Sequence, residues 1–420
     1  MKLKDIADYV TEKISSDAID LDSYITTDSL LQNKAGRDKA VNMPPQTCML
    51  TRYKVGDILV ANIRPYLKKV WMADIDGGCN ADVLVFRAKS NHSANFLYAV
   101  LLQDAFYTYA MKGAKGSKMP RGDRDQIMRY EIPMLSASEE SIGNFIVDIN
   151  AKIALNREIN RNLEVMARQL YDYWFVQFDF PDENGRPYKS SGGAMKFDKA
   201  LGIEIPAEWK IDRLNTFITS NNTGDWGYDE DNEHRMPVGC IRGADIVKLN
   251  DVPLRYIKKT NTHKLLSPYD IVIEVSGGSP VQATGRCAYI TPGVIKRNYG
   301  NMTCSNFCHA FRMKTIESSA YFYFTWKTLY DNNIMFNFEG KTSGIKNFMT
   351  ETFLANKWYV APDILQKLFF NRISNIFSII DSNIEEINHL IKQRDELLPL
   401  LMNGQVSVMP SEVNCDLSHD

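Results

Sequence analysis

Long apolar runs are absent from this chain of 420 residues, and so is the apolar segment that marks a secretory signal. No stretch approaches the roughly 20 consecutive apolar residues that are needed to cross a bilayer. The first residues, Met1–Asp5, are mostly charged instead of apolar. We therefore expect a cytoplasmic protein with no membrane partner.

Cysteine is scarce and scattered. Seven cysteines, an odd number, argue against a disulfide framework and for a reducing compartment. Cys304, Cys308 and the adjacent His309 suggest zinc, but no second ligand pair follows at finger-like spacing. We interpret this segment as a buried strand and expect no metal.

Catalytic motifs are also missing. Gly340-Lys341-Thr342 resembles the end of a phosphate-binding loop, but Met335 stands where its first glycine is required. None of the six histidines is paired at the spacing of metal ligands or of a catalytic triad. The sequence therefore predicts a protein without an active site and without a cofactor of its own.

Positive charge is in only slight excess, in two separate blocks. Residues 1–135 hold 19 Lys and Arg against 16 Asp and Glu, and residues 196–362 hold 20 against 17, although the whole chain carries −2. Two mildly basic blocks are compatible with DNA binding without demonstrating it.

What the chain does contain is an internal repeat. The pairs Cys79-Asn80 and Phe86-Arg87 match Cys304-Ser305 and Phe311-Arg312 at a constant offset of 225. Two further matches flank these pairs, namely Asp57–Val60 with Asp270–Ile273, and the Gly- and Lys-rich Gly113–Lys118 with Gly340–Lys346. Repeats of this length indicate two related α/β blocks.

A long helical pattern follows each block. Apolar residues and one asparagine recur every seven residues, as Ile142, Ile149, Asn156, Leu163 and Leu170, and again as Phe369, Ile376, Asn383, Leu390 and Leu397. Such heptads predict a helix-on-helix interface. We place Ile146, Ile153, Ile159, Met166 and Ile379 among the flanking interface residues.

The two asparagines, Asn156 and Asn383, lie at the same register near the middle of their helices. If the helices are antiparallel, these amides meet and form a hydrogen bond that fixes register at some cost in stability. The alternative is that both lie on a solvated flank. Each helix of about 40 residues would be roughly 60 Å long, a rigid spacer between the two blocks.

The stretch after the first helix carries a family resemblance. Leu170–Pro181 (LYDYWFVQFDFP), Glu204–Trp209 (EIPAEW) and Leu397–Val406 (LLPLLMNGQV) resemble the conserved regions of type I restriction–modification specificity (S) subunits. The resemblance covers the whole chain, although Asn403-Gly404-Gln405 departs from the Thr-Gly-Lys-like ending typical of the family.

That resemblance implies an α+β fold in which two similar α/β target-recognition domains are joined by two long antiparallel coiled-coil-like helices, with a pseudo-twofold internal repeat. The expected segments are recognition domain 1 (1–137), central helix (138–178), connector (179–209), recognition domain 2 (210–362), distal helix (363–403) and tail (404–420).

The resemblance also implies a non-catalytic subunit that recognises a bipartite target in double-stranded DNA. Its expected partners are two methyltransferase (M) subunits and the restriction/translocase (R) subunits, and S-adenosylmethionine, ATP and Mg are expected on those partners. Two alternatives stay open, a free-standing DNA-binding regulator and a nucleic-acid enzyme with an unfamiliar site.

Loops rich in Gly, Ser, Lys and Arg are the candidate DNA contacts, because such loops follow a phosphate backbone closely and present donors. The candidates are Arg64, Lys68, Lys69, Lys115, Ser117, Lys118, Arg121, Arg124, Arg286, Lys341, Thr342, Ser343 and Lys346. The aromatic residues Tyr173, Trp174 and Phe175 are compatible with base stacking, but we favour burial at a helix or subunit interface.

Overall fold

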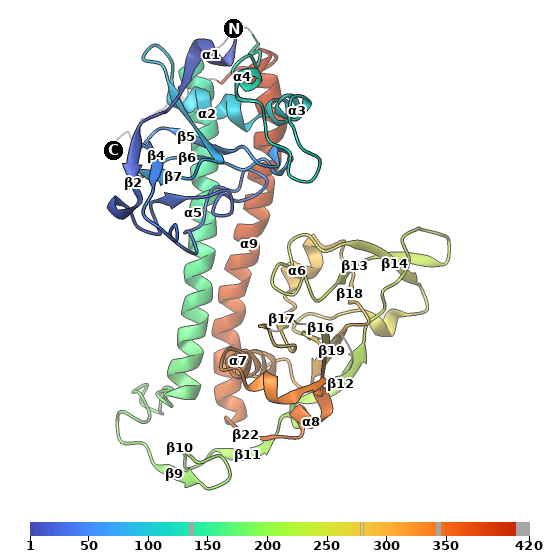
Figure 1. Ribbon diagram of the computed structural model, residues 1–420. Coiled ribbons are helices and arrows are strands. Elements are labelled where there is room, and N and C mark those ends of the chain that lie inside the picture. Colours follow the sequence, from blue (N-terminus) through green and yellow to red (C-terminus); the bar gives the residue numbers. More distant parts are fainter. Residues whose placement is uncertain (134–137, 278, 280, 342–345, 409–420) are drawn as a thin grey trace, which may run out of the picture. The chain divides into compact units, whose positions relative to one another are not determined.

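The computed structural model (Figure 1) describes residues 1–133, 138–277, 279, 281–341 and 346–408, and of Lys341 only the backbone. The fold is mixed α and β, as the sequence predicts. The chain divides into a first unit, residues 1–156 with 386–420, and a second unit, residues 157–385. Both divisions fall inside long helices, α5 (Glu139–Tyr171) and α9 (Asp363–Met402). Among the described residues, no helix is both long and apolar enough to span a bilayer.

The first unit contains two four-stranded sheets, in the orders β1-β8-β5-β6 and β2-β4-β7-β3. Its strands are β1 (Ala7–Tyr9), β2 (Lys13–Ser15), β3 (Tyr24–Ile25), β4 (Met49–Tyr53), β5 (Ile58–Ala61), β6 (Val70–Met72), β7 (Gly77–Cys79) and β8 (Val83–Ala88). Its short helices are α1 (Leu3–Ile6), α2 (Ala94–Leu102), α3 (Asp104–Lys112), α4 (Arg124–Ile127), η1 (Ser16–Ala18) and η2 (Pro65–Leu67). All four residues of β5 are buried, which explains its unbroken apolar sequence.

The second unit has a sheet of matching order, β12-β19-β15-β17, and a smaller one, β14-β13-β18. Its strands are β9 (Met195–Asp198), β10 (Ile203–Pro206), β11 (Lys210–Arg213), β12 (Ile218–Thr223), β13 (Arg235–Ile241), β14 (Leu254–Lys258), β15 (Ile271–Glu274), β16 (Ser276–Gly277), β17 (Cys287–Tyr289), β18 (Met302–Cys304), β19 (Cys308–Met313), β20 (Glu339–Lys341), β21 (Lys346–Phe348) and β22 (Lys357–Val360). Its shorter helices are α6 (Pro292–Arg297), α7 (Ser318–Asp331), α8 (Thr350–Leu354), η3 (Asp172–Val176), η4 (Leu214–Phe217), η5 (Thr262–Lys264) and η6 (Ile334–Phe338).

The repeated residues occupy equivalent positions in the two units. Ile58 of β5 is paired with Phe86 of β8, and Ile271 of β15 is paired with Phe311 of β19. The smaller sheets share only a parallel pair, β3 with β7 and β13 with β18, and differ in the strands added to it. One sheet is thus common to both units and the other diverges.

An ion pair between a buried carboxylate and a partly exposed arginine also recurs at the start of the third strand of each matching sheet. Asp57 accepts hydrogen bonds from Nε (2.8 Å) and Nη2 (2.7 Å) of Arg87. Asp270 accepts the same two bonds from Arg312, at 3.0 and 2.8 Å. These bonds raise the pKa of both arginines, and they explain why an Asp and an Arg stand in both copies of the repeat.

Within the first unit, α5 and α9 lie antiparallel. Asn150 Oδ1 accepts a hydrogen bond from Arg394 Nη1 (2.8 Å), and six residues further along α5, Asn156 Nδ2 donates to Glu386 Oε2 (2.7 Å). Isoleucines fill the interval, with Ile153 packed near Ile387. A hydrogen bond between the two helices thus lies on each side of the isoleucine cluster.

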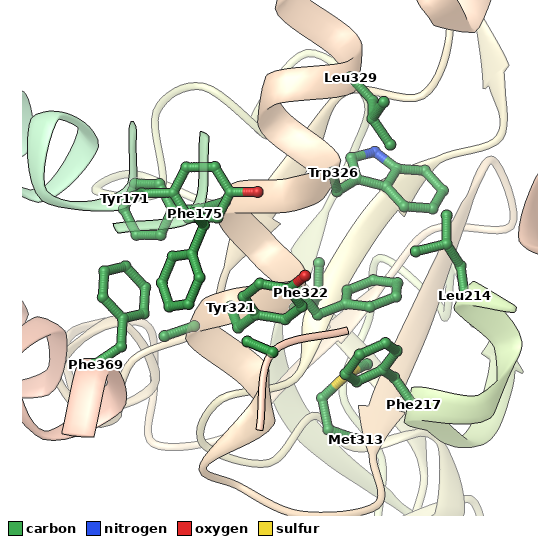
Figure 2. Packing of buried hydrophobic residues seen from close by; sticks show 14 of the residues in the cluster. Tyr171, Phe175, Leu214, Phe217, Met313, Tyr321, Phe322, Trp326, Leu329 and Phe369 are labelled. Atoms are coloured by element: carbon green, nitrogen blue, oxygen red, sulfur yellow. The ribbon is translucent and has the colours of Figure 1, made fainter. Parts of the chain in front are cut away.

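Within the second unit, the same two helices join a large aromatic core. Figure 2 shows Phe175 directed toward Phe369 of α9 and Tyr321 of α7. The ring centroids of Phe175 and Phe369 are 4.9 Å apart, as are those of Phe175 and Tyr321. Trp174 is buried against Phe369, whereas the side chain of Tyr173 is 38% exposed. Two of the three aromatic candidates are therefore core residues of this unit.

Three details of the helix interface differ from the sequence-based expectation. Ile159, Met166 and Ile379 are exposed, so their assignment to the interface is wrong. In α5, the neighbours of Ile159 and Met166, namely Asn160 and Ala167, are buried in their place. Asn160 is tolerated there because its Oδ1 accepts a hydrogen bond from Asn383 Nδ2 (2.8 Å). Asn156 and Asn383 therefore have different partners in place of the mutual bond that we expected.

Candidate nucleic-acid interface

Three loops meet at one edge of the first unit. Asn62, which follows β5, donates its backbone N–H to the backbone carbonyl of Asp82 in the β7–β8 turn (2.8 Å). Its carbonyl accepts from Gly122, at the end of the Gly- and Lys-rich loop (3.1 Å). Lys115 and Arg121 close that loop into a small hairpin through two backbone bonds of 2.9 Å. The β-sheet therefore presents the candidate loop on a fixed base.

The second unit repeats these connections. Val275, the counterpart of Asn62, donates its N–H to Phe307 in the β18–β19 turn (2.9 Å) and accepts from Phe348 (2.8 Å). The strands β20 and β21 enclose the second Gly- and Lys-rich loop, and β21 pairs with β16. The same three-loop arrangement is thus built twice, with different side chains.

Basic side chains in the first unit fall into two groups. Arg64, Lys115, Ser117, Lys118, Arg121 and Arg124 are exposed around the three loops. Of these, Arg121 forms an ion pair with Asp82 (3.0 Å), and Lys115 lies 3.7 Å from Asp123. This group keeps donors available to an anionic ligand.

Lys68 and Lys69 belong to the other group, because internal contacts engage them. Lys68 Nζ forms an ion pair with Asp104 (2.8 Å), which also binds the buried Lys34 (2.8 Å). Partial burial opposes ionisation of Asp104, but these two lysines lower its pKa. Lys69 Nζ donates to the carbonyl of Thr27, and burial lowers the pKa of Lys69. Both lysines stabilise the fold of this unit.

Among the described residues, the second unit offers fewer free cations at its loops. Arg286 is held by Glu274 through bonds of 2.8 and 2.6 Å, which raise its pKa, and both side chains are largely buried. Lys346 forms an ion pair with Glu339 (2.8 Å). Thr342, Ser343 and the side chain of Lys341 lie outside the described residues. The structure thus gives Arg286 a structural contact where the sequence suggests a DNA contact.

Two exposed aromatic residues were missed from the sequence. Phe307 and Trp226, 54% and 38% exposed, line an open, largely apolar hollow of about 390 Å³ with Arg242 and the turn residues Ser305 and Asn306. Phe307 stands where the first unit has Asp82, at the same offset of 225 as the recognised repeat. Aligning the β7–β8 and β18–β19 turns at that offset identifies Phe307 from the sequence.

The cysteine pair that suggested zinc lies in the core of the second unit. Burial raises the pKa of Cys308 to about 12, so its thiol stays protonated, and Cys304 Sγ donates to the carbonyl of Cys308 (3.6 Å). His309 Nδ1 is bonded to Asn221 Oδ1 (2.9 Å). Among the described residues, no group of three or more His, Cys, Asp or Glu side chains could hold a metal ion.

Thiol reactivity tests this burial. In a Cys415→Ser variant we expect a disulfide reagent to label Cys48 within minutes, because Cys48 is the exposed thiol among the six described ones. Burial raises the pKa of Cys79 and Cys287 to about 12, so they should react only after denaturation. Labelling followed by peptide mapping measures this, and rapid modification of Cys308 in the native protein would contradict it.

Comparison with known proteins adds evidence beyond the geometry. No protein-family model matches the chain. The MjaIX type I restriction enzyme specificity subunit of Methanocaldococcus jannaschii is 24% identical over 329 residues, 75% of this chain and 69% of that protein. The HindI specificity subunit of Haemophilus influenzae is 24% identical over 42% of this chain and 40% of that protein.

Among solved structures, the S subunit of a type I restriction–modification system from M. genitalium aligns with 98% of this chain and 96% of its own, with a TM-score of 0.53 and 13% identity. The curated homologues of the chain are thus type I restriction enzyme specificity subunits, and its fold is that of a type I S subunit.

Proposed function

We propose that this chain is the non-catalytic DNA-recognition subunit of a type I restriction–modification enzyme and reads a bipartite target. The observation that carries the proposal is the three-loop arrangement, which is built with the same backbone bonds around Asn62 in the first unit and Val275 in the second. A protein with two such loop sets can read two half-sites independently. Similarity to specificity subunits over most of the chain supports the same function.

In this proposal the first unit contacts DNA through the exposed donors around its loops. Arg64, Lys118 and Arg121 are free or only partly engaged, so they can reach phosphates or guanine edges. In the second unit, Phe307 and Trp226 present apolar surface at the corresponding place. We infer that the two half-sites are read by different chemistry.

The partner subunits would supply the chemistry that this chain lacks. We propose that α5, α9 and the connector bind two methyltransferase subunits, to which the restriction/translocase subunits are added. S-adenosylmethionine, ATP and Mg then belong to those partners. The exposed apolar residues Ile159, Met166 and Ile379 on the two helices suit such a protein interface.

Exchanging residues 1–137 for the recognition domain of another specificity subunit tests the proposal. We expect one half-site of the methylated motif to change and the other to stay, because each unit carries its own sheet and loops. Sequencing of methylated bases in cells that express the exchanged chain with its methyltransferase subunit measures this. A change in both half-sites would refute independent reading.

The same purified components separate the two alternatives. Methyl transfer from S-adenosylmethionine by this chain alone would make it an enzyme. Sequence-specific DNA binding without complex formation on co-expression with a methyltransferase subunit would make it a free-standing regulator.

A further inference from the structure

In the second unit, the sheet β12-β19-β15-β17, here called the second recognition sheet, is attached to α9 along a line of contacts that starts in the aromatic core. Phe369 is fully buried there. Further along α9, the ring of Phe370 lies 5.0 Å from that of Tyr269, and the ring of Phe377 lies 5.3 Å from that of Tyr289. These aromatic contacts form the first point of attachment.

A second point of attachment lies beyond them and is ionic. Arg297, at the end of α6, places Nη1 2.6 Å from Asp381 Oδ1, with side chains only 8% and 14% exposed. Its neighbour Lys296 forms an exposed ion pair with Glu385 (2.9 Å). Asp381 is twelve residues after Phe369, about 18 Å along a helix that rises 1.5 Å per residue, and four residues, about 6 Å, after Phe377.

Packing between the two points is incomplete. An open hollow of about 260 Å³ lies beside α6 and α9. Its lining includes Ser374, Ser378 and Ser382 of α9 and Gly293 of α6, together with Tyr269 and Phe377 of the aromatic contacts and Asp381 of the ion pair. At Gly293 the approach is close instead, since a Cβ atom there would lie 2.3 Å from Cγ of Asp381. The sheet is therefore held by an aromatic anchor at one end and by ion pairs at the other.

Such a two-point attachment has a mechanical consequence. Three of the α9 residues at the hollow are serines, so beyond the aromatic contacts α6 is held on α9 by the ion pairs and by the close approach at Gly293. A buried arginine–carboxylate pair has a narrow geometry, and one partner left alone carries a large desolvation cost. The pair therefore selects one angle between the sheet and the helix.

We propose that Arg297 and Asp381 are positioning residues that set the angle of the second recognition sheet on α9 and so restrict the enzyme to one spacer length between half-sites. This inference rests on the proposed function, because it presumes a bipartite target. Neither residue needs to touch DNA.

The test uses the full chain, co-expressed with its methyltransferase subunit, and motif-resolved sequencing of methylated DNA. Arg297→Gln should allow methylation at half-sites whose spacer is one base pair longer or shorter. We expect the ratio of these sites to wild-type sites to rise roughly tenfold, which corresponds to ~1.4 kcal/mol of lost preference. Arg297→Lys, which keeps the charge, should restore much of the single spacer.

The control is Asp8→Asn, which removes a carboxylate from the exposed Lys89–Asp8 pair (3.5 Å) of the first unit, away from both long helices. It should leave the spacer unchanged. If Arg297→Gln fails to assemble with the methyltransferase subunit, Lys296→Gln carries the test with a smaller change, roughly twofold, because that pair is exposed.

A single spacer at full methylation in Arg297→Gln would overturn the inference. So would a uniform loss of methylation without new spacers, since that is the result of a merely structural role. If the wild-type chain directs methylation to a continuous motif or to none, the proposed function itself fails, and the inference with it.

Discussion

Phe175→Ala is expected to lower the free energy of unfolding by about 3–5 kcal/mol, the usual effect of removing a large ring from a closed core. Phe175 is fully buried, and its ring lies within 4.9 Å of two others, those of Tyr321 and Phe369 (Figure 2). These neighbours come from two different helices, so the cavity cannot close by a shift of one side chain. Chemical denaturation measures the change.

Tyr173→Ala is the matched control for this experiment, because it truncates an aromatic residue two positions away. The Tyr173 side chain is 38% exposed. Its loss should change the free energy of unfolding by about 1 kcal/mol or less. Equal effects of the two substitutions would mean that this segment does not have the burial described above.

Asp57→Asn and Asp270→Asn should each destabilise one unit, by about 1.5–2 kcal/mol. Each carboxylate is nearly buried and accepts two bonds from an arginine and one from a backbone N–H, that of Lys54 or Ser267. Hydrogen bonds to charged groups contribute about 1.5–3 kcal/mol, and partial exposure of the arginines reduces this. Both effects should be similar, because each carboxylate accepts the same three kinds of hydrogen bond.

Hydrogen exchange followed by mass spectrometry locates the damage. Asp57→Asn should lower protection in β5 and β8, and Asp270→Asn in β15 and β19. The control, Asp8→Asn, alters a carboxylate that is 69% exposed and should change the stability by no more than about 0.5 kcal/mol. Loss of protection in β15 and β19 on substitution of Asp57 would contradict the assignment of the two pairs to separate units.

The strands of the matching sheets could be predicted because the two copies share particular charged residues as well as an apolar pattern. Asp57 and Arg87 recur as Asp270 and Arg312 since a carboxylate turned into the sheet needs its guanidinium partner. The smaller sheets could not be predicted in this way. Their shared part is a short parallel pair, and the strands added to it differ between the units.

The sequence predicts the seven-residue spacing of the helix interface, but it does not identify every residue that lies in it. Apolar identity is the sequence sign of an interface position, and it predicts Ile159 there but not Asn160 or Arg394. Arg394 is 1% exposed because Asn150 and Asp395 accept its hydrogen bonds. Polar residues of this kind become visible only when their partners on the other helix are known.

For the candidate interface, the sequence identified basic loops but not which cations are free. Arg286 and Lys69 have the composition of ligand-binding residues, yet Glu274 and the carbonyl of Thr27 bind them internally. Those partners are 12 and 42 residues away in the sequence. No local pattern reports such pairings.

The discontinuity of the first unit has a consequence for protein synthesis. Its hydrophobic core includes Leu398, Leu401 and Met402 of α9, which are translated after all of residues 157–385. Early domains commonly fold while the rest of the polypeptide is still being made. Here the nascent amino-terminal portion would leave the ribosome with part of its apolar surface uncovered and wait for the last helix, so chaperone demand should fall on the half that is made first.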